Sequence, residues 1–227
     1  LRDPHTLMAF FWFARNRNAP IAQSPDQFMN HDDITTVLDQ FSELVSHLNS
    51  DCFEMDPIAV YDLMSSDTDA PAYCPHGYGY ISYARDGFKK HTLKFTDIAD
   101  AAGGGVSGTV LGGTGIAVSA LSKHKALATD YAFYIAGEEC QSQHWVSSGG
   151  QPGNARAWES KECNNICNNF LSDTRATLEA AWIRPRYEGY LSFQAQGSKI
   201  VSDFLKGETS QKSCIDLLEN TYKSSAK

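Results

Sequence analysis

The residues with the clearest capacity for chemistry surround His76, which lies in the turn-like sequence CPHGY at 74–78. A histidine in an exposed turn can act as a general acid or base, because its ordinary pKa is about 6.5. Acidic partners would have to come from distant residues such as Asp130, Glu138 and Glu139. Glu138 and Glu139 are adjacent, and adjacent residues of a strand point to opposite faces. A hydrolase that uses His76 is therefore an alternative function, and an enzyme is not the favoured interpretation.

Known cofactor signatures do not explain the chain. Gly103, Gly105 and Gly108 have the G-x-G-x-x-G spacing of dinucleotide sites, but residues 95–102 (FTDIADAA) before them are not a hydrophobic strand. The sequence contains no phosphate-binding G-x-x-x-x-G-K-[ST], no G-x-S-x-G and no H-E-x-x-H. We therefore predict no cofactor and no metal.

The cysteines offer a second kind of chemistry. An even number of cysteines without a C-x-x-C pair or zinc-finger spacing favours disulfides, with buried thiols as the alternative. We expect Cys52 to pair with Cys74, and Cys140 and Cys214 to pair with the other two. Disulfides and a first residue that is leucine, as after removal of a signal segment, predict a secreted protein. The six positions are Cys52, Cys74, Cys140, Cys163, Cys167 and Cys214.

Residues 101–121 (AAGGGVSGTVLGGTGIAVSAL) are 21 consecutive uncharged residues. A helix that rises about 1.5 Å per residue would reach across a hydrocarbon core of about 30 Å with this length. Three glycines at intervals of four form a stripe that lets another helix approach closely. We predict a Gly-rich apolar helix that contacts a membrane and allows a homo-oligomer to form through the stripe. Its residues are Gly104, Gly108 and Gly112, with Val110, Leu111, Ile116 and Val118 around them.

Two other structures are open for residues 101–121. Seven glycines lower the hydropathy of the segment, so a permanent membrane span is less favoured than a buried soluble helix or a set of tight turns. A turn with positive φ at Gly108 would already be destabilised by alanine, whereas a packed helix would tolerate it.

The elements that would position these residues mix two periodicities. Apolar residues three and four apart predict helices at 5–15, 31–48, 57–63, 157–182, 198–206 and 210–223. Runs rich in tyrosine, phenylalanine and β-branched residues predict strands at 77–85, 91–95, 130–137 and 189–195. The expected fold is α+β and disulfide-stapled, with helices at both ends and a small central antiparallel sheet. We divide the chain into 1–99, 100–127 and 128–227, or treat it as one compact domain.

Composition limits the partners. The 227 residues carry 19 lysines and arginines against 27 aspartates and glutamates, a formal charge of −8. Without a basic cluster, this charge excludes a nucleic-acid binder. Lys89 and Lys90 form a dibasic pair at which proteolytic processing would split the chain.

Together these features predict a secreted toxin or effector. In layout it is similar to microbial killer toxins, which combine secretion, disulfides and apolar helices. That resemblance implies a target-cell membrane or a surface receptor as the partner, reached through residues 101–121. A non-enzymatic extracellular binding protein, in which the glycine segment is merely core, is the third hypothesis beside the toxin and the hydrolase.

Overall fold

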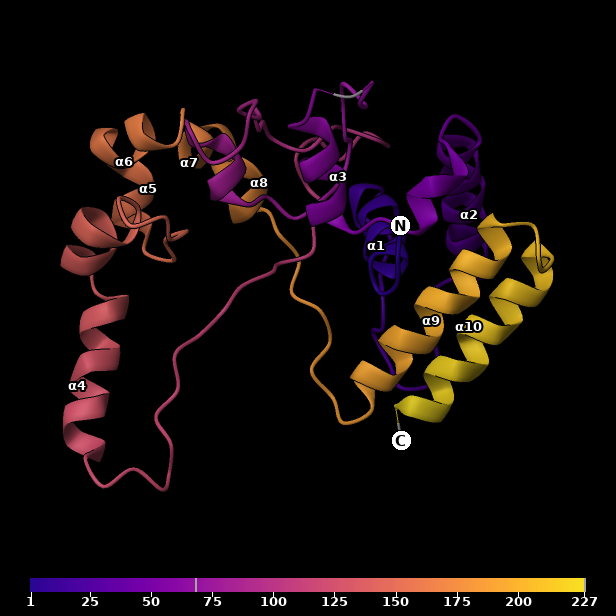
Figure 1. The fold of residues 1–227 in the computed structure, drawn as a ribbon. Helices are drawn as coiled ribbons and strands as arrows, with labels where there is room; N and C mark the ends of the chain where they lie inside the picture. Colours follow the sequence, from indigo (N-terminus) through magenta and orange to yellow (C-terminus); the bar gives the residue numbers. More distant parts are fainter. Residues whose placement is uncertain (68, 227) are drawn as a thin grey trace.

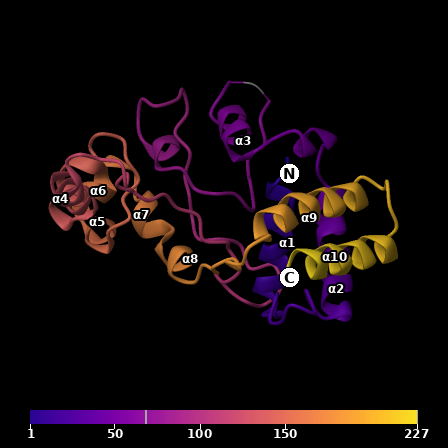
Figure 2. The same ribbon diagram turned by 90° about the horizontal axis from the view of Figure 1, so that it is seen from below.

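A computed structural model describes residues 1–67 and 69–226 of the chain. Its two ends meet in a four-helix bundle made of α1 (His5–Asn16), α2 (His31–Ser46), α9 (Tyr190–Leu205) and α10 (Gln211–Ser225). The bundle lies on one side of the molecule, and α9 and α10 run along each other in both views (Figures 1 and 2). The first and last parts of the sequence therefore share one hydrophobic core.

Helix α1 is the centre of this core, because ten of its twelve residues are buried. Its aromatic side chains contact rings from distant parts of the chain: Phe11 lies 5.3 Å from Trp182 and Phe13 lies 5.3 Å from Phe41, between ring centroids. Such ring contacts add about 0.5–1.5 kcal/mol each to the area that is buried. Packing inside the protein thus accounts for the apolar composition of the first helix.

Helix α2 shows how local sequence defines an element. The side chain of Asn30 accepts a hydrogen bond from the Asp32 amide and caps the helix, at 2.9 Å. The buried residues of α2 recur three and four apart, which places one apolar face against the bundle. They are Ile34, Val37, Leu38 and Phe41.

The middle of the chain forms a second, smaller core of short helices. The helices that contribute residues to it are η2 (Ile81–Ala84), α5 (Ala155–Glu159), α6 (Lys161–Ile166) and α7 (Phe170–Asp173). The other short helices of the middle of the chain are η1 (Ser50–Phe53), α3 (Pro57–Met64), η3 (Cys140–Trp145) and α8 (Arg175–Glu179). Phe170 is central to this core, since its ring lies 5.0 Å from that of Phe95 and 6.4 Å from that of Trp158. Helix α4 (Lys125–Ala136) projects from this part as an arm, away from the bundle (Figure 1).

The side chain of Asn16 joins α1 to the glycine-rich segment. Its Oδ1 accepts hydrogen bonds from the amides of Ala101 (2.9 Å) and Ala102 (2.7 Å). Its Nδ2 donates to the carbonyl oxygens of Gly105 (3.0 Å) and Ser107 (2.7 Å). Asn16 is fully buried, and these four bonds use both donors and both acceptor sites of its amide.

The predicted helix over 101–121 is wrong, and the segment is a chain of turns followed by extended backbone. Gly104 touches the end of α1, where a Cβ would lie 2.0 Å from the Asn16 carbonyl oxygen. Gly108 has a φ of +116°, and its Cβ would lie 2.9 Å from the Trp12 carbonyl oxygen. Gly104 and Gly108 therefore contact the chain's own first helix, Gly112 contacts Tyr78, and the three glycines do not form a stripe on a helix.

The α+β assignment is also wrong. Among the described residues the only β-structure is two isolated bridges, Ser24 with Gln27 and Val110 with Trp182. Residues 130–137 belong to α4, and residues 190–195 begin α9. Over a longer window, Phe193, Gly197 and Val201 repeat every four residues, so α9 buries one helical face. Residues 77–85 and 91–95 share a single backbone hydrogen bond, from Leu93 N to Tyr83 O, and form no sheet.

The single long helix predicted over 157–182 is divided into short pieces. Ser160 ends α5 and caps α6, where its Oγ accepts from the Cys163 amide. Asn168 and Asn169 have φ of +48° and +64°, a left-handed conformation that ends a helix. The helices predicted at 5–15, 31–48 and 57–63 are confirmed as α1, α2 and α3. The helix predicted at 198–206 is the second half of α9, and the one predicted at 210–223 is the larger part of α10.

The predicted disulfides are not formed. All six cysteines are free thiols, of which Cys140, Cys163, Cys167 and Cys214 are buried. Within residues 1–67 and 69–226, no helix has both the length and the apolarity needed to cross a bilayer. The killer-toxin-like interpretation is therefore wrong, since its disulfides, its sheet and its membrane helix are all missing from the part of the chain that the structure describes. The division at residues 99 and 127 stays a prediction.

Gly108→Ala should lower the free energy of unfolding by about 1–3 kcal/mol, because a side chain is strained at φ of +116° and meets the α1 backbone. Gly113→Ala is the matched control, since no atom lies within 4 Å of a Cβ there. Urea unfolding of both variants measures the difference. Equal midpoints would mean that Gly108 does not pack on α1.

Candidate functional site

Tyr78 packs against the core of the bundle. The Oη of Tyr61, on α3, donates a hydrogen bond to the Tyr78 carbonyl oxygen at 3.1 Å and so fixes the backbone. The Tyr78 ring lies against Gly112, where a Cβ would come within 2.7 Å of ring atom Cε1. On another side it meets the His5 ring edge-on at 6.2 Å. A half-buried aromatic ring is thus held beside the glycine-rich segment.

Arg184 reaches the same place from the segment that joins α8 to α9. Its Nη1 donates to Oε1 of Gln194 at 2.6 Å and lies 3.9 Å from the Met8 sulfur. The backbone before it is positioned by a parallel bridge, in which Trp182 N donates to Thr109 O and Leu111 N donates to Trp182 O, both at 2.8 Å. The same bridge brings Arg184 near Gly112 and Tyr78.

The guanidinium affects the two phenols beside it. Burial raises the pKa of Tyr190 to about 12, although the positive charge of Arg184 opposes the rise. Burial also raises the pKa of Tyr78, again against Arg184. Both phenols therefore stay neutral at physiological pH and can donate and accept hydrogen bonds. Tyr78, Arg184, Tyr190 and Gln194 form what we call the junction site.

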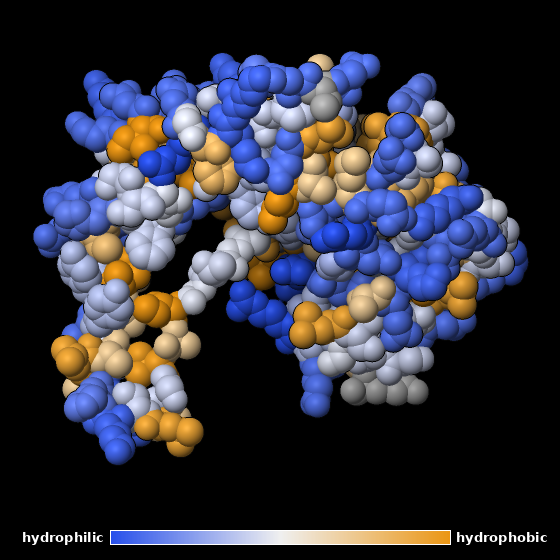
Figure 3. Space-filling view, viewed as in Figure 1, coloured by the Kyte–Doolittle hydropathy of each residue, from blue (hydrophilic) through white to orange (hydrophobic). Residues whose placement is uncertain are grey.

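The α4 arm stands apart from the bundle (Figure 3). Figure 3 shows a wide gap in the surface between the α4 arm and the bundle. The connecting segments 112–124 and 180–189 run along this gap (Figure 1). Aromatic rings beside the N–H donors of an arginine, as in the junction site, are typical of sites for polar organic ligands.

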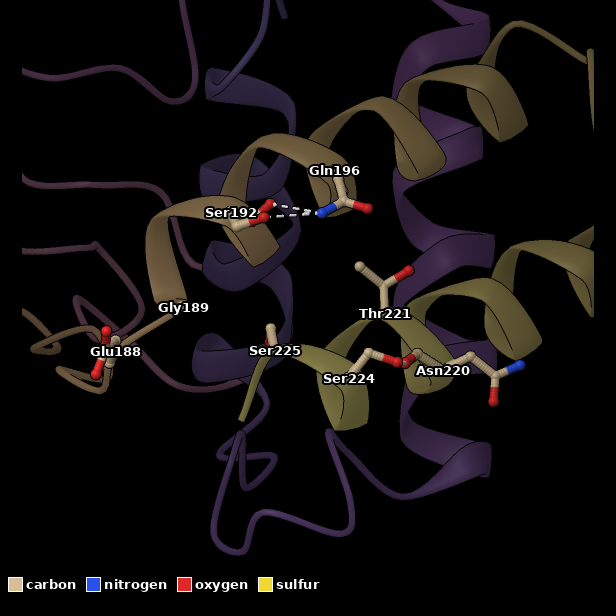
Figure 4. A pocket seen from close by; sticks show the side chains of 8 residues that line it. All are labelled: Glu188, Gly189, Ser192, Gln196, Asn220, Thr221, Ser224 and Ser225. Carbon is tan, nitrogen blue, oxygen red and sulfur yellow. Dashed lines mark hydrogen bonds between the residues drawn. The ribbon is translucent and has the colours of Figure 1, made fainter. Parts of the chain in front are cut away.

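A second depression lies at the ends of α9 and α10 (Figure 4). Its volume is about 520 Å³, and its lining is polar, without an aromatic ring. Gln196 Nε2 donates to Ser192 Oγ at 2.9 Å within it. Open polar grooves of this kind offer hydrogen bonds but little apolar area, so it is the weaker candidate. The lining residues are Glu188, Gly189, Ser192, Gln196, Asn220, Thr221, Ser224 and Ser225.

His76 is not placed as a catalytic residue would be. Its ring stacks on Trp12, with centroids 5.2 Å apart and an angle of 13° between the planes. Burial, with the positive charges of His5 and the N-terminus, lowers the pKa of His76 to about 4. Asp130 lies on the α4 arm, away from α1 and the Trp12–His76 pair (Figures 1 and 2).

The residues predicted for membrane contact are dispersed. Val110 is buried in the bridge to Trp182, Leu111 and Val118 are half-buried, and Ile116 is exposed. Gly112 alone reaches the junction site. Lys89 forms an ion pair with Asp62 at 2.7 Å, and Lys90 forms one with Asp67, so both lysines of the dibasic pair are engaged. In the described part of the chain, no cluster of three or more His, Cys, Asp or Glu residues could hold a metal.

The sequence analysis missed Tyr78, Arg184 and Tyr190. The signal that could have found them is the interleaving of rings with glycine or arginine in GYGY (77–80) and WIRPRY (182–187). The first run lies in a predicted strand and the second starts at the end of a predicted helix. The pattern of rings that the two runs share is therefore not apparent from the predicted elements. The two runs meet through Gly112, which the Tyr78 ring contacts, and through the bridge of Val110 with Trp182 just before it.

The chain matches no known protein family and no curated protein by sequence. Among solved structures it is similar to maltose-bound MalE3 of T. maritima, with a TM-score of 0.67 and 13% sequence identity. The likeness covers 97% of this chain and 56% of MalE3, so the chain spans little more than half of that protein's length. At this identity the comparison shows the fold alone: the chain has the fold of part of MalE3.

The burial of His76 makes stability depend on pH. Between the folded pKa of about 4 and the unfolded value of 6.5, the unfolded chain binds more protons, so stability falls as the pH is lowered through this window. His76→Gln should weaken this dependence. His31→Gln is the control, because His31 is exposed at the start of α2. Urea unfolding at pH 7, 5.5 and 4.5 measures how the free energy of unfolding changes with pH. The same change in wild type and in His76→Gln would show that folding does not lower the pKa of His76.

Proposed function

We propose that this chain is the ligand-holding part of an extracellular solute-binding protein and that its ligand is a carbohydrate. The observation that carries the proposal is the meeting of the Tyr78 ring and the Arg184 guanidinium, which Gln194 of α9 holds in place. The fold supports it, because MalE3, whose fold this chain shares, was solved with maltose bound. We also propose that the protein lies outside the cell. Fractionation of cells that make the natural protein tests this location.

The chemistry of the junction site suits a sugar ring. A pyranose presents apolar C–H faces, which pack on aromatic rings, and hydroxyl groups at its edge, which need donors and acceptors. Tyr78 supplies the ring, and Arg184 supplies a fork of N–H donors that Gln194 orients. Neutral Tyr190 lies beside Arg184 as a further polar group.

The same geometry disfavours the hydrolase hypothesis. A general acid or base needs a pKa near the working pH and access to the substrate. His76 has a pKa of about 4, and one face of its ring is covered by Trp12. A binding role without chemistry therefore fits the described residues better.

Titration calorimetry with maltose, maltotriose and glucose tests the proposal. Tyr78→Ala should weaken binding of the recognised sugar about tenfold, which corresponds to a loss of about 1.4 kcal/mol for one aromatic contact. Tyr73→Ala is the matched control, because Tyr73 is 65% exposed and close in sequence. No heat with any sugar, or equal affinity in wild type and Tyr78→Ala, would contradict the proposal.

A further inference from the structure

The guanidinium of Arg184 has no carboxylate partner within residues 1–67 and 69–226. Acidic partners are plentiful, because the chain has 27 aspartates and glutamates against 19 lysines and arginines. Arg2, Arg156 and Arg175 each pair with one of them. Arg184 is half-buried, and a charge that is partly removed from water needs an opposite charge nearby to stabilise it. The described part of the chain does not supply that charge.

Two arginines on α1 show what can replace a carboxylate. Arg15 and Arg17 are also half-buried, but both lie at the C-terminal end of α1, where the negative end of the helix dipole stabilises a cation. Arg15 also lies over the Trp182 ring, 5.9 Å from its centroid. Arg184 instead bonds to Gln194 in the second turn of α9, near the positive end of that helix. The helix dipole there favours a further negative group beside Arg184.

Most N–H donors of Arg184 remain available. Its two hydrogen bonds both come from Nη1, to Oε1 of Gln194 at 2.6 Å and to the sulfur of Met8 at 3.9 Å. Nε and Nη2 carry three further N–H groups and have no carboxylate, carbonyl or amide acceptor within the described chain. Neither atom is among the buried polar atoms of the described chain that lack a partner, so both keep contact with solvent. A ligand can therefore reach this edge of the guanidinium.

Tyr190 adds a second donor without an acceptor. It is the first residue of α9 and lies one helical turn before Gln194, so the two side chains share a face of the helix. Its Oη is buried and finds no acceptor for its proton among the described residues. Burial keeps the phenol neutral, with a pKa of about 12, and the guanidinium of Arg184 beside it cannot accept a proton. The junction site thus presents several donors and no negative group, an arrangement that suits an anion.

We propose that the carbohydrate recognised at the junction site carries an anionic group, a carboxylate or a phosphate, which binds the guanidinium of Arg184. This inference rests on the proposed function and specifies its ligand: a sugar acid or a sugar phosphate in preference to a neutral sugar. The planar fork of an arginine matches two oxygens of either group, with N–H···O bonds of about 2.7–2.9 Å. The sugar ring packs on Tyr78, and its charged group lies toward Arg184 and α9.

Calorimetric titrations at pH 7 test the charge of the ligand with glucose, glucuronate and glucose 6-phosphate. These sugars share one ring and differ in the group at carbon 6. We expect one of the two anions to bind at least about tenfold more tightly than glucose, because a bidentate charged pair is stronger than a neutral hydrogen bond. The tighter of the two identifies the group as a carboxylate or a phosphate.

The same titrations separate failure of this inference from failure of the carbohydrate proposal. Equal affinity for glucose and both anions would overturn the inference and leave the carbohydrate proposal intact. Acetate or inorganic phosphate that binds as tightly as the charged sugar would show that the sugar ring contributes nothing, and both proposals would then be wrong. Absence of binding by every sugar would also contradict both.

Arg184→Gln removes the charge and keeps a side-chain amide. It should abolish the tenfold preference for the charged sugar, because the remaining groups of the junction site are neutral. Arg186→Gln is the matched control: Arg186 is exposed, lies two residues further on and forms no ion pair within the described chain. It loses the same charge and should keep the preference. A preference that survives Arg184→Gln, or that Arg186→Gln abolishes equally, would overturn the inference.

Melting temperatures without ligand show whether Arg184 has a structural role instead. Arg184→Gln should melt at or above the temperature of the wild type, because it removes a half-buried charge that has no partner in the described chain. If this variant fails to fold, Arg184→Lys decides: it keeps the charge but lacks the planar fork, so it should retain only part of the preference. A lower melting temperature in Arg184→Lys with an undiminished preference would assign Arg184 to the fold alone and overturn the inference.

Discussion

The buried amide of Asn16 determines how the two halves of this molecule are connected. It ends the central helix of the bundle and makes four hydrogen bonds to residues 101–107, with no solvent to replace any of them. An unsatisfied amide at this position would cost about 1–3 kcal/mol for each lost partner, so the loop must follow the path that satisfies it. Gly104 and Gly108 meet this constraint, because only a residue without a side chain can lie so near the α1 backbone.

From this contact the chain reaches the junction site in a few residues. After Gly108, Thr109 and Leu111 form the bridge with Trp182, and Gly112 receives the Tyr78 ring. The segment 180–189, held by the same bridge, carries Arg184 to Gln194 on α9. Residues that are about a hundred positions apart in sequence are thus assembled by one buried amide and one pair of backbone hydrogen bonds.

The glycine-rich segment is held by other parts of the chain along only part of its length. Up to residue 112 the glycine-rich stretch is held by α1, Trp182 and Tyr78, and beyond it the backbone has no partner. The fully packed bundle and the bare α4 arm therefore differ in how far their apolar groups are covered.

Local sequence determined the helices whose signals are continuous and short in range. Asn30 and Asp56 cap α2 and α3, and the apolar spacing of α2 identified its buried face. The aromatic density of 5–15 identified the central helix of the core, although not its partners.

Tertiary structure decided everything that depends on contacts distant in sequence. The run 101–121 has a composition that permits a helix, turns or extended backbone, and the choice came from Asn16 and Trp182, which lie far from it in the sequence. Residues 130–137 and 189–195 carry strand-forming residues but no partner strand, so they became helical. The junction site was invisible to sequence reasoning for the same reason: each of its residues is ordinary alone, and only the folded chain places a ring, a guanidinium and a neutral phenol side by side.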